Sequence, residues 1–388
     1  MKKIFLMLSL AAFVACYSPE RFEADGSSKG ESSLSDFGTL FDVNGGRQIC
    51  NPSVTMDEEN FPASMLWLNF SGTLNVAEAP KGFSTKGVGE HDRLTISDTA
   101  GKVLWFLMID SVPGVECEFQ DPEWSADGRF VVALGGFNAK GSKGSKGCDE
   151  IEYGIFAVRL SDNATFFLVD RSVGEYADPH LWVGAPKKQV DSTDSLQMFF
   201  GTDEIKLVYS DASGLVYMDY AKDAKPVKLS KPESALENEL GNPLISPDGN
   251  FVVYHRLVSS FEWDSYVQEL SPTAKPVKME KTEGMLSFPV FPHWWNFNGR
   301  QFIVWAEFAP GNSYLNKNDL LKESTWDASV GRTAMREVSA NASAPGDISI
   351  EWIGNVREIA PVPLIGGRSP SGHLVSTGTN NGYLLYIP

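Results

Sequence analysis

The stretch NPLISPDGNFVVYHR, residues 242–256, combines a turn with a strand. Pro247 fixes the backbone angle φ for a turn and has no N–H to donate to a sheet. Asp248 can bond its own backbone, and Gly249 tolerates a positive φ. The apolar run at residues 251–254 is typical of a strand buried on both faces, as an inner strand of a larger sheet would be.

The same pattern occurs six times along the chain. In the clearest second copy, DPEWSADGRFVVALGG at 121–136, Asp127 and Gly128 take the places of Asp248 and Gly249. The other copies are FPHWWNFNGRQFIVWAE at 291–307, RSPSGHLVSTG at 368–378, the weaker NPSVTMDEENFPASMLWLNFSG at 51–72, and DPHLWVG at 178–184 with an expected strand LQMFFGT at 196–202. Their spacing of roughly 50–70 residues is typical of propeller blades. The recurrence indicates that these Asp-Gly pairs form turns and are not catalysts.

The pattern P-x-W-S-P-D-G before an apolar strand, followed by a strand such as GLVYMD, resembles the TolB-type repeat, a relative of WD-repeat propellers. This resemblance extends over about residues 40–388 and implies an all-β, six-bladed propeller of four-stranded antiparallel blades, with its domain at 37–388. The last copy has few strands after it, so we expect GTLFDV at 38–43 and RQIC at 47–50 to complete its blade. N- and C-terminal strands would then close the ring.

The N-terminus carries an export signal. Lys2 and Lys3 precede an apolar stretch too short to span a bilayer, which predicts a signal peptide at 1–15. FVAC, at 13–16, resembles a bacterial lipobox, although Phe13 replaces its commonest residue, leucine. The resemblance implies lipidation of Cys16, a flexible tether at 16–36, and a membrane-anchored lipoprotein in the periplasm or on the cell surface. The alternative is a buried cysteine in an uncleaved segment.

Three further cysteines follow the lipobox. Cys117 and Cys148 flank one repeat and are the favoured disulfide pair in an exported protein, which leaves Cys50 over. The alternative that all three are free stays open. No spacing of cysteine and histidine indicates a metal site.

Composition and motifs exclude several functions. A net charge of −17 disfavours nucleic acid, and no apolar run after the signal peptide is long enough to span a membrane. The sequence lacks G-x-S-x-G, a P-loop, a dinucleotide fingerprint and HExxH, so we expect neither a cofactor nor a nucleophilic hydrolase.

Aromatic and histidine side chains gather beside the repeats. His180, His293 and Trp294 are candidate binding residues, because aromatic planes with a few polar groups suit sugars, peptides and proteins. The alternative is packing between blades, which we favour for Trp124 and Trp295. Polar segments at 140–147 and 309–347 predict loops on the ring.

These features predict a cell-envelope lipoprotein whose propeller is a non-catalytic binding or scaffolding module for a protein or glycan. One alternative is a carbohydrate-active hydrolase or lyase that uses axial carboxylates, for which Glu307 at a strand end is one candidate. Another is a structural subunit of an envelope complex.

Overall fold

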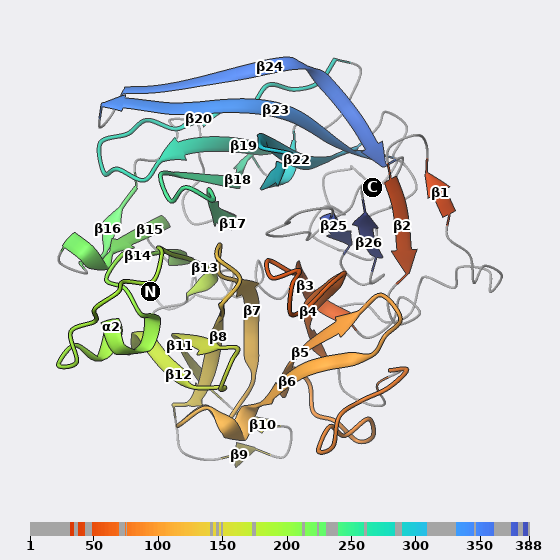
Figure 1. Ribbon diagram of the computed structural model, residues 1–388, viewed down its shortest axis with the longest axis vertical. Helices are drawn as coiled ribbons and strands as arrows, with labels where there is room; N and C mark the ends of the chain where they lie inside the picture. The colour runs from red at the N-terminus through yellow and green to blue at the C-terminus, as the bar shows by residue number, and fades with distance from the viewer. Residues whose placement is uncertain are drawn as a thin grey trace, which may run out of the picture.

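In the computed structural model, the chain forms four-stranded antiparallel sheets arranged around a common centre (Figure 1). This is an all-β propeller. The structure describes residues 32–34, 38–42, 49–69, 74, 76–139, 143–144, 147–148, 150–172, 176–211, 214–222, 225–229, 240–259, 262–283, 289–308, 331–344, 347–360, 374–378 and 383–386. The expected signal peptide and Cys16 lie outside these residues. In the described part, no helix is long and apolar enough to cross a membrane.

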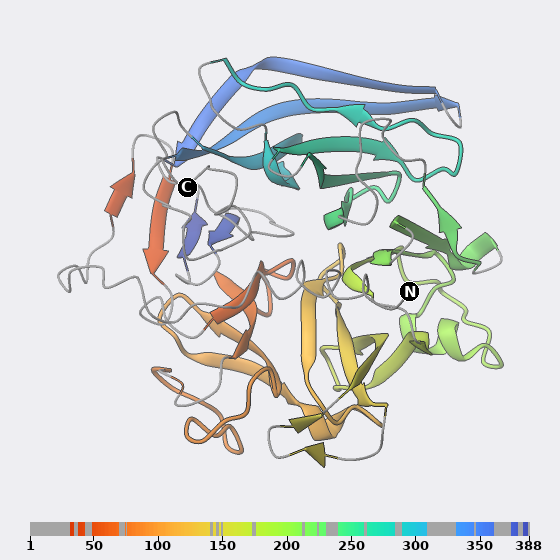
Figure 2. The same cartoon turned by 180° about the vertical axis from the view of Figure 1, so that it is seen from behind.

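Five blades are each built from strands that follow one another in the chain, and Figure 2 shows the same ring from behind. From the centre outward, blade 1 contains β3 (Ile49–Val54), β4 (Ser64–Asn69), β5 (Arg93–Asp98) and β6 (Val103–Met108), and blade 2 contains β7 (Phe119–Trp124), β8 (Phe130–Asn138), β11 (Ile151–Arg159) and β12 (Thr165–Ser172). Blade 3 contains β13 (Ala177–Val183), β14 (Ile205–Asp211), β15 (Gly214–Asp219) and β16 (Val227–Lys228), and blade 4 contains β17 (Leu240–Ile245), β18 (Phe251–Ser259), β19 (Glu262–Glu269) and β20 (Val277–Lys278). Blade 5 contains β21 (Val290–Phe297), β22 (Arg300–Phe308), β23 (Gly331–Ala344) and β24 (Asp347–Ala360).

The expected count of six blades is corrected to five blades of consecutive strands. A further four-stranded sheet joins both ends of the chain, in the order β1 (Ser32–Leu34), β2 (Gly38–Asp42), β26 (Tyr383–Tyr386) and β25 (Leu374–Gly378). In the described residues, the sixth repeat and the chain after it supply two strands, β25 and β26, and the N-terminal strand β2 pairs with β26. β1 falls inside the expected tether at 16–36. Ile49 and Cys50 of RQIC do not join this sheet, because they begin β3.

The innermost strand of each blade is not the apolar run after the Asp-Gly turn. In blade 4 the sheet order places β17, which carries Asn242 and Pro243, first and the apolar β18 second. The first strands of neighbouring blades contact one another around the centre, from β3 through β7, β13 and β17 to β21. A second strand has a blade partner on each edge and side chains packed on each face, which explains why it is the more apolar.

A bulge interrupts every one of these first strands at the residue before proline. The bulge residues all have left-handed φ values between 45° and 52°, and they are Asn51, Asp121, Asp178, Asn242 and Phe291. The sheet register shifts at each of them. A following proline disfavours the right-handed helical region, and Asn and Asp tolerate the left-handed one better than other non-glycine residues. The Asn-Pro and Asp-Pro pairs of the repeat therefore encode the bulge.

The turns that follow the first strands are the same in blades 2 and 4. Gly128 N–H donates to the Ser125 carbonyl at 2.9 Å, and Gly249 N–H donates to Ser246 at 2.8 Å. Both glycines have φ of +74°. The Asp248 carboxylate accepts the Ser246 hydroxyl and, at 3.1 Å, the backbone N–H of Asn250. These contacts give Asp248 a turn-forming role.

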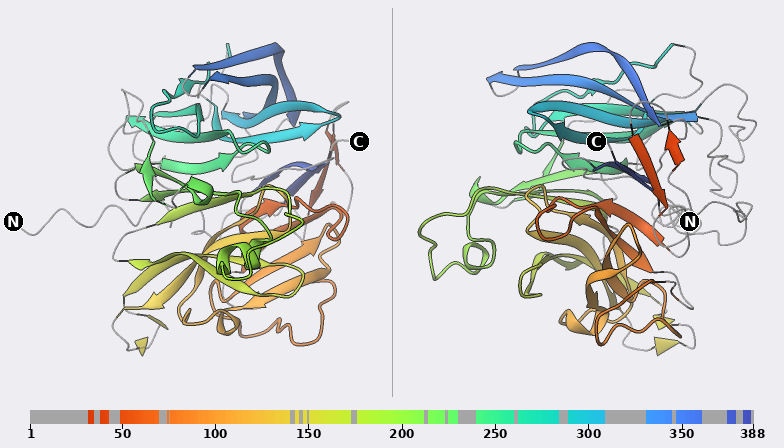
Figure 3. Two further views of the ribbon diagram at one scale, coloured as in Figure 1. Left: turned by 60° about the vertical axis from the view of Figure 1, so that its left-hand side comes forward. Right: turned by 45° about the vertical axis from the view of Figure 1, so that its right-hand side comes forward.

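LQMFFGT at 196–202 forms a helix instead of the expected strand. α2 (Ser195–Phe200) begins at Asp194, whose side chain accepts the N–H groups of Leu196 and Gln197. It ends at Gly201, which is left-handed with φ of +74°. Both ends are thus capped, and these local signals override the apolar run. Figure 3 shows α2 projecting from the ring.

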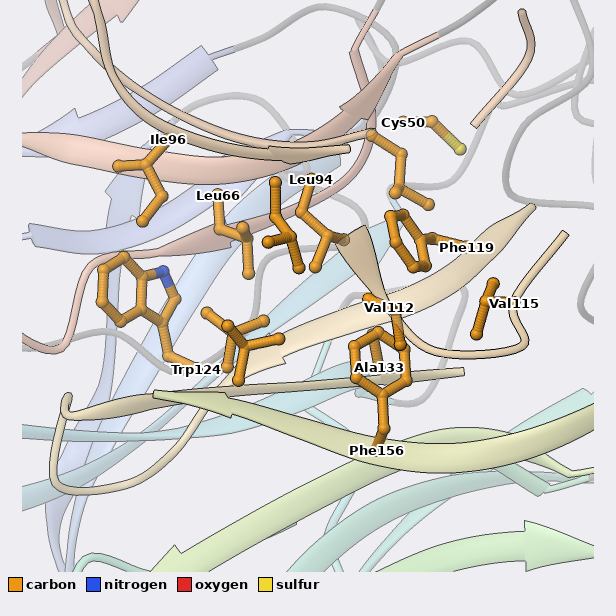
Figure 4. Close-up of a cluster of buried hydrophobic side chains, with 14 of the residues drawn as sticks. Cys50, Leu66, Leu94, Ile96, Val112, Val115, Phe119, Trp124, Ala133 and Phe156 are labelled. Atoms are coloured by element: carbon orange, nitrogen blue, oxygen red, sulfur yellow. The ribbon is translucent and has the colours of Figure 1, made fainter. Parts of the chain in front are cut away.

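Apolar side chains fill the spaces between blades. Figure 4 shows the cluster between blades 1 and 2, where Trp124 is buried and its indole N–H donates to the Ser53 carbonyl at 3.3 Å. On the other side of the ring, β23 continues past β22, and Trp352 and Ile350 of its hairpin pack against the core of blade 4. Residues 331–344 of the expected loop insert are therefore a strand.

Candidate binding face

The five bulge residues form what we call the entry rim, where the chain enters each blade nearest the centre. Asn51 Nδ2 donates to Asp121 Oδ1 at 2.8 Å, and the N–H of Asp178 donates to Asp121 Oδ2 at 3.2 Å. The N–H of Asn242 then donates to Asp178 Oδ2 at 3.3 Å. Hydrogen bonds between first strands thus run through blades 1, 2, 3 and 4, and they hold neighbouring blades in register.

Blade 5 departs from this pattern because its bulge residue is Phe291. The N–H of Phe291 donates to His255 Nδ1 of blade 4 at 2.9 Å, so an imidazole replaces the carboxylate as acceptor. The His255 and Phe291 rings meet edge to face with centroids 4.5 Å apart. The imidazole also lies so close to Gly241 that a Cβ there would collide with it. Asn242, next to that glycine, is thereby placed between Asp178 and Phe291 on the rim.

The bonds on Asn242 and on Asp121 differ. Both oxygens of the Asp121 carboxylate accept hydrogen bonds, and the residue is 2% exposed. Asn242 is 9% exposed, and within the described residues its side-chain amide makes no hydrogen bond. The nitrogen and oxygen of this amide keep some contact with solvent. At blade 2 both side-chain oxygens of the rim residue are hydrogen-bonded, and we call this part of the rim closed. At blade 4 the side-chain amide makes no hydrogen bond in the described residues, and we call this part the open sector.

The three predicted binding residues lie in the interior. His180, His293 and Trp294 are 2%, 1% and 4% exposed. His180 Nδ1 accepts the N–H of Ile245 at 3.0 Å, and Trp294 Nε1 donates to the Leu244 carbonyl at 3.0 Å. His180 and Trp294 join their blades to blade 4. His293 Nδ1 lies 3.1 Å from the Phe291 carbonyl oxygen of its own strand. As they stand, these side chains serve packing and offer no surface to a ligand.

The entry ends of blades 1 and 2 are joined by a loop residue that the sequence did not single out. His91 is buried with φ of +49°, its Nδ1 lies 3.0 Å from Gln120 Nε2, and its carbonyl accepts the N–H of Phe119 at 2.9 Å. Burial lowers the pKa of His91 to about 4, although the charge of Asp92 opposes the shift. His91 is therefore neutral at physiological pH.

An acidic pair lies beside this junction. The Tyr153 hydroxyl donates to Glu118, and burial followed by that carboxylate raises the pKa of Tyr153. Burial, and then the charge of Glu118, also raises the pKa of Glu90. Beside Glu118, the structure joins Cys117 to Cys148 with their Cα atoms 5.7 Å apart, which is the pair that the sequence favoured. No described cysteine is free, so the leftover thiol expected at Cys50 is not found.

Two fully buried carboxylates in blades 4 and 5 are neutralised by cations. Glu307, proposed from the sequence as an axial or solvated carboxylate, is 0% exposed; it accepts Trp305 Nε1 and Arg332 Nε, each at 2.8 Å. Asp264 lies 2.6 Å from Lys278 Nζ. These are structural ion pairs. Among the described residues, no group of three or more His, Cys, Asp or Glu side chains is placed to hold a metal.

No protein-family model and no curated protein matches the sequence. Solved structures do match. A TolB protein from Agrobacterium tumefaciens is 10% identical with a TM-score of 0.42, covering 90% of this chain and 95% of its own. The protein YjhT is 7% identical with a TM-score of 0.43, covering 87% and 93%. An exo-1,5-α-L-arabinanase from a bovine ruminal metagenomic library is 12% identical with a TM-score of 0.39, covering 79% and 98%. These likenesses concern the fold, and the sheet order above independently makes it a propeller.

The sequence contained a signal for the entry rim. Asn-Pro or Asp-Pro opens four of the five first strands, and Phe-Pro opens the other. Asp121-Pro122 and Asn242-Pro243 hold the same place in the two clearest copies of the repeat. Asn and Asp are the non-glycine residues that best tolerate a left-handed backbone, so these pairs already pointed to a bulge.

Proposed function

We propose that this protein is an exported cell-envelope lipoprotein, anchored through Cys16, whose propeller is a non-catalytic binding module for a protein or glycan partner. The observation that carries the proposal is the use of the rim carboxylates. Asp121 and Asp178 both accept backbone N–H groups of the following blade. These two carboxylates therefore connect blades. This structural use favours recognition over catalysis as the function of the rim.

Hydrolysis of a glycosidic bond needs one carboxyl group that gives a proton and a second that acts as base or nucleophile. Both oxygens of Asp121 are occupied, while Glu307 and Asp264 are paired with Arg332 and Lys278. These carboxylates are already used to join blades or to pair with cations. This supports a binding role for the described part of the ring.

One observation favours the alternative, a carbohydrate-active enzyme. Burial and the charge of Glu118 raise the pKa of Glu90, and a carboxyl group with a raised pKa beside a second carboxylate resembles an acid and base pair. Reducing-sugar assays on neutral and uronic-acid polysaccharides test this role. The binding proposal expects no turnover. Turnover that Glu90→Gln abolishes while Glu116→Gln preserves it would replace the proposal with the enzyme.

The lipid anchor and the partner need separate tests. Mass spectrometry of the mature protein from membranes should find a diacylglyceryl group on Cys16, and an unmodified or uncleaved N-terminus would contradict the anchor. Crosslinking of the lipidated protein in intact cells should then enrich one envelope protein or glycan over the Cys16→Ser variant. If neither class is enriched, the binding module is contradicted even where the anchor is present.

A further inference from the structure

The open sector of the entry rim has the composition of a small-molecule contact. Asn242 lies between Asp178, which is half-buried and accepts its N–H at 3.3 Å, and Phe291, which is half-buried and held against His255. An amide, a carboxylate and an aromatic ring therefore follow one another on adjacent blades. The side-chain amide of Asn242 is the member of this set with no hydrogen bond inside the described residues.

We propose that this sector, residues Asp178, Asn242 and Phe291, binds a neutral sugar unit of a glycan. The inference rests on the proposed binding function and names the class of its partner. Neighbouring hydroxyl groups of a sugar each donate and accept, so they can bond to a carboxylate and an amide side by side. An aromatic ring offers an apolar plane for the C–H groups of the sugar.

Charge favours a neutral sugar over an acidic one. Asp178 is on the rim, Asp121 lies next to it, and the chain carries a net charge of −17. An anionic glycan would bring like charges together at a partly desolvated carboxylate. The side-chain amide of Asn242 can instead form hydrogen bonds with uncharged hydroxyl groups, which both donate and accept.

The described surface argues against a protein as the occupant of this sector. Protein interfaces are centred on exposed apolar anchors. Among the described residues, the large apolar side chains that are substantially exposed are Met198, Val277 and Ile353. They lie on α2, β20 and β24, and none lies on a first strand. A sugar unit needs no such patch, because its contact is mainly directional hydrogen bonds and one ring face.

The test is calorimetric titration of the full propeller with neutral oligosaccharides, namely cellohexaose, xylohexaose, mannohexaose and α-1,5-arabinohexaose. At least one should bind, and Asn242→Ala should weaken that binding about tenfold, because two hydrogen bonds of roughly 0.7 kcal/mol each are lost. Asn242→Asp should weaken it as well, since it removes the donor. Asn296→Ala is the matched control, because Asn296 is exposed on β21 and outside the rim.

Equal affinity of Asn242→Ala and wild type would overturn the sugar site, as would an equal loss in Asn296→Ala. Binding of none of the four sugars would also overturn it. In that case, enrichment of an envelope protein by crosslinking would leave the binding module standing, so the two proposals can fail separately. A cooperative unfolding transition well above the titration temperature for Asn242→Ala ensures that a lost affinity is not lost folding.

Discussion

Blades 2 and 4 are nearly the same at one end and different at the other. In the turns after their first strands, Ser125 and Ser246 make the same hydrogen bonds to Phe130 and Phe251, and both turns end in a left-handed glycine. At the entry rim, Asp121 of blade 2 has both side-chain oxygens bonded, whereas the Asn242 amide of blade 4 has no bond in the described residues.

The difference separates what makes a blade from what makes a site. A feature repeated in each blade serves the contact that each blade makes with its neighbour. A feature that blade 2 has and blade 4 lacks is not required to build a blade and is available for recognition. On this view the turns are structural and the open sector of the rim is the place where this chain differs from a generic ring.

The largest effect is expected in the turns. A Cβ at Gly128 would collide with the backbone carbonyl of Met56 while φ is +74°. Gly128→Ala should lower the free energy of unfolding by about 3 kcal/mol or more. Gly299 has φ of +73° with nothing within 4 Å, so Gly299→Ala should cost only about 1 kcal/mol. Urea unfolding measures the free energy of unfolding of both variants. Equal losses in Gly128→Ala and Gly299→Ala would mean that the strained φ, and not the contact between blades, makes glycine necessary at residue 128.

The closed part of the rim should come next. Asp121→Ala removes the acceptor for the Asn51 side chain and for the N–H of Asp178, so both hydrogen bonds between blades are lost. The expected loss is about 2–3 kcal/mol in the free energy of unfolding. Asp110→Ala, at an exposed position, should stay within about 0.5 kcal/mol. If Asp121→Ala were equally mild, the hydrogen bonds between first strands would not hold the blades together.

The entry end should also be sensitive to acid through His91. Its pKa falls from 6.5 unfolded to about 4 folded, so the unfolded chain binds the proton more tightly. The stability that this neutral histidine contributes is complete above about pH 6.5 and is lost as the pH falls toward 4. Linkage gives a loss of about 2 kcal/mol between about pH 7.5 and pH 5.

The control for that effect is His91→Asn, which tolerates the left-handed backbone and does not titrate. The difference in unfolding free energy between the two pH values should be about 2 kcal/mol smaller in the variant than in wild type. An unchanged difference would place the acid sensitivity elsewhere in the molecule.

The sequence predicted the features that repeat. Turn-forming Asp127 and Asp248 and the propeller follow from local chemistry that recurs along the chain, and the four-stranded blades follow from the resemblance to the TolB-type repeat. The Cys117 and Cys148 pair was favoured for a separate reason, because the two residues flank one repeat. The apolar run after the turn is an inner strand of its blade, as predicted, but the sequence did not show that another strand, β17, lies nearer the centre. LQMFFGT was misread as a strand because its caps, Asp194 and Gly201, lie outside the apolar run.

The site depended on information that no single repeat contains. His180 and Trp294 suit either a ligand or a neighbouring blade, and only the packing of blade 4 against them decides. Asn242 looked like a copy of Asp121, since both precede a proline. What distinguishes them is the bonding of their side chains to other blades, more than 60 residues away in sequence.

The smallest effect on stability is expected at the open part of the rim. Asn242→Ala removes a side chain with no hydrogen bond in the described residues, while its backbone N–H still donates to Asp178. We expect a loss of at most about 1 kcal/mol, with the left-handed φ of 47° as the main cost. Asn242→Gly relieves that cost and should be at least as stable as Asn242→Ala. If Asn242→Ala lowered the free energy of unfolding nearly as much as Asp121→Ala, the two side chains would serve the fold alike. Blade 4 would then have no open sector available for binding.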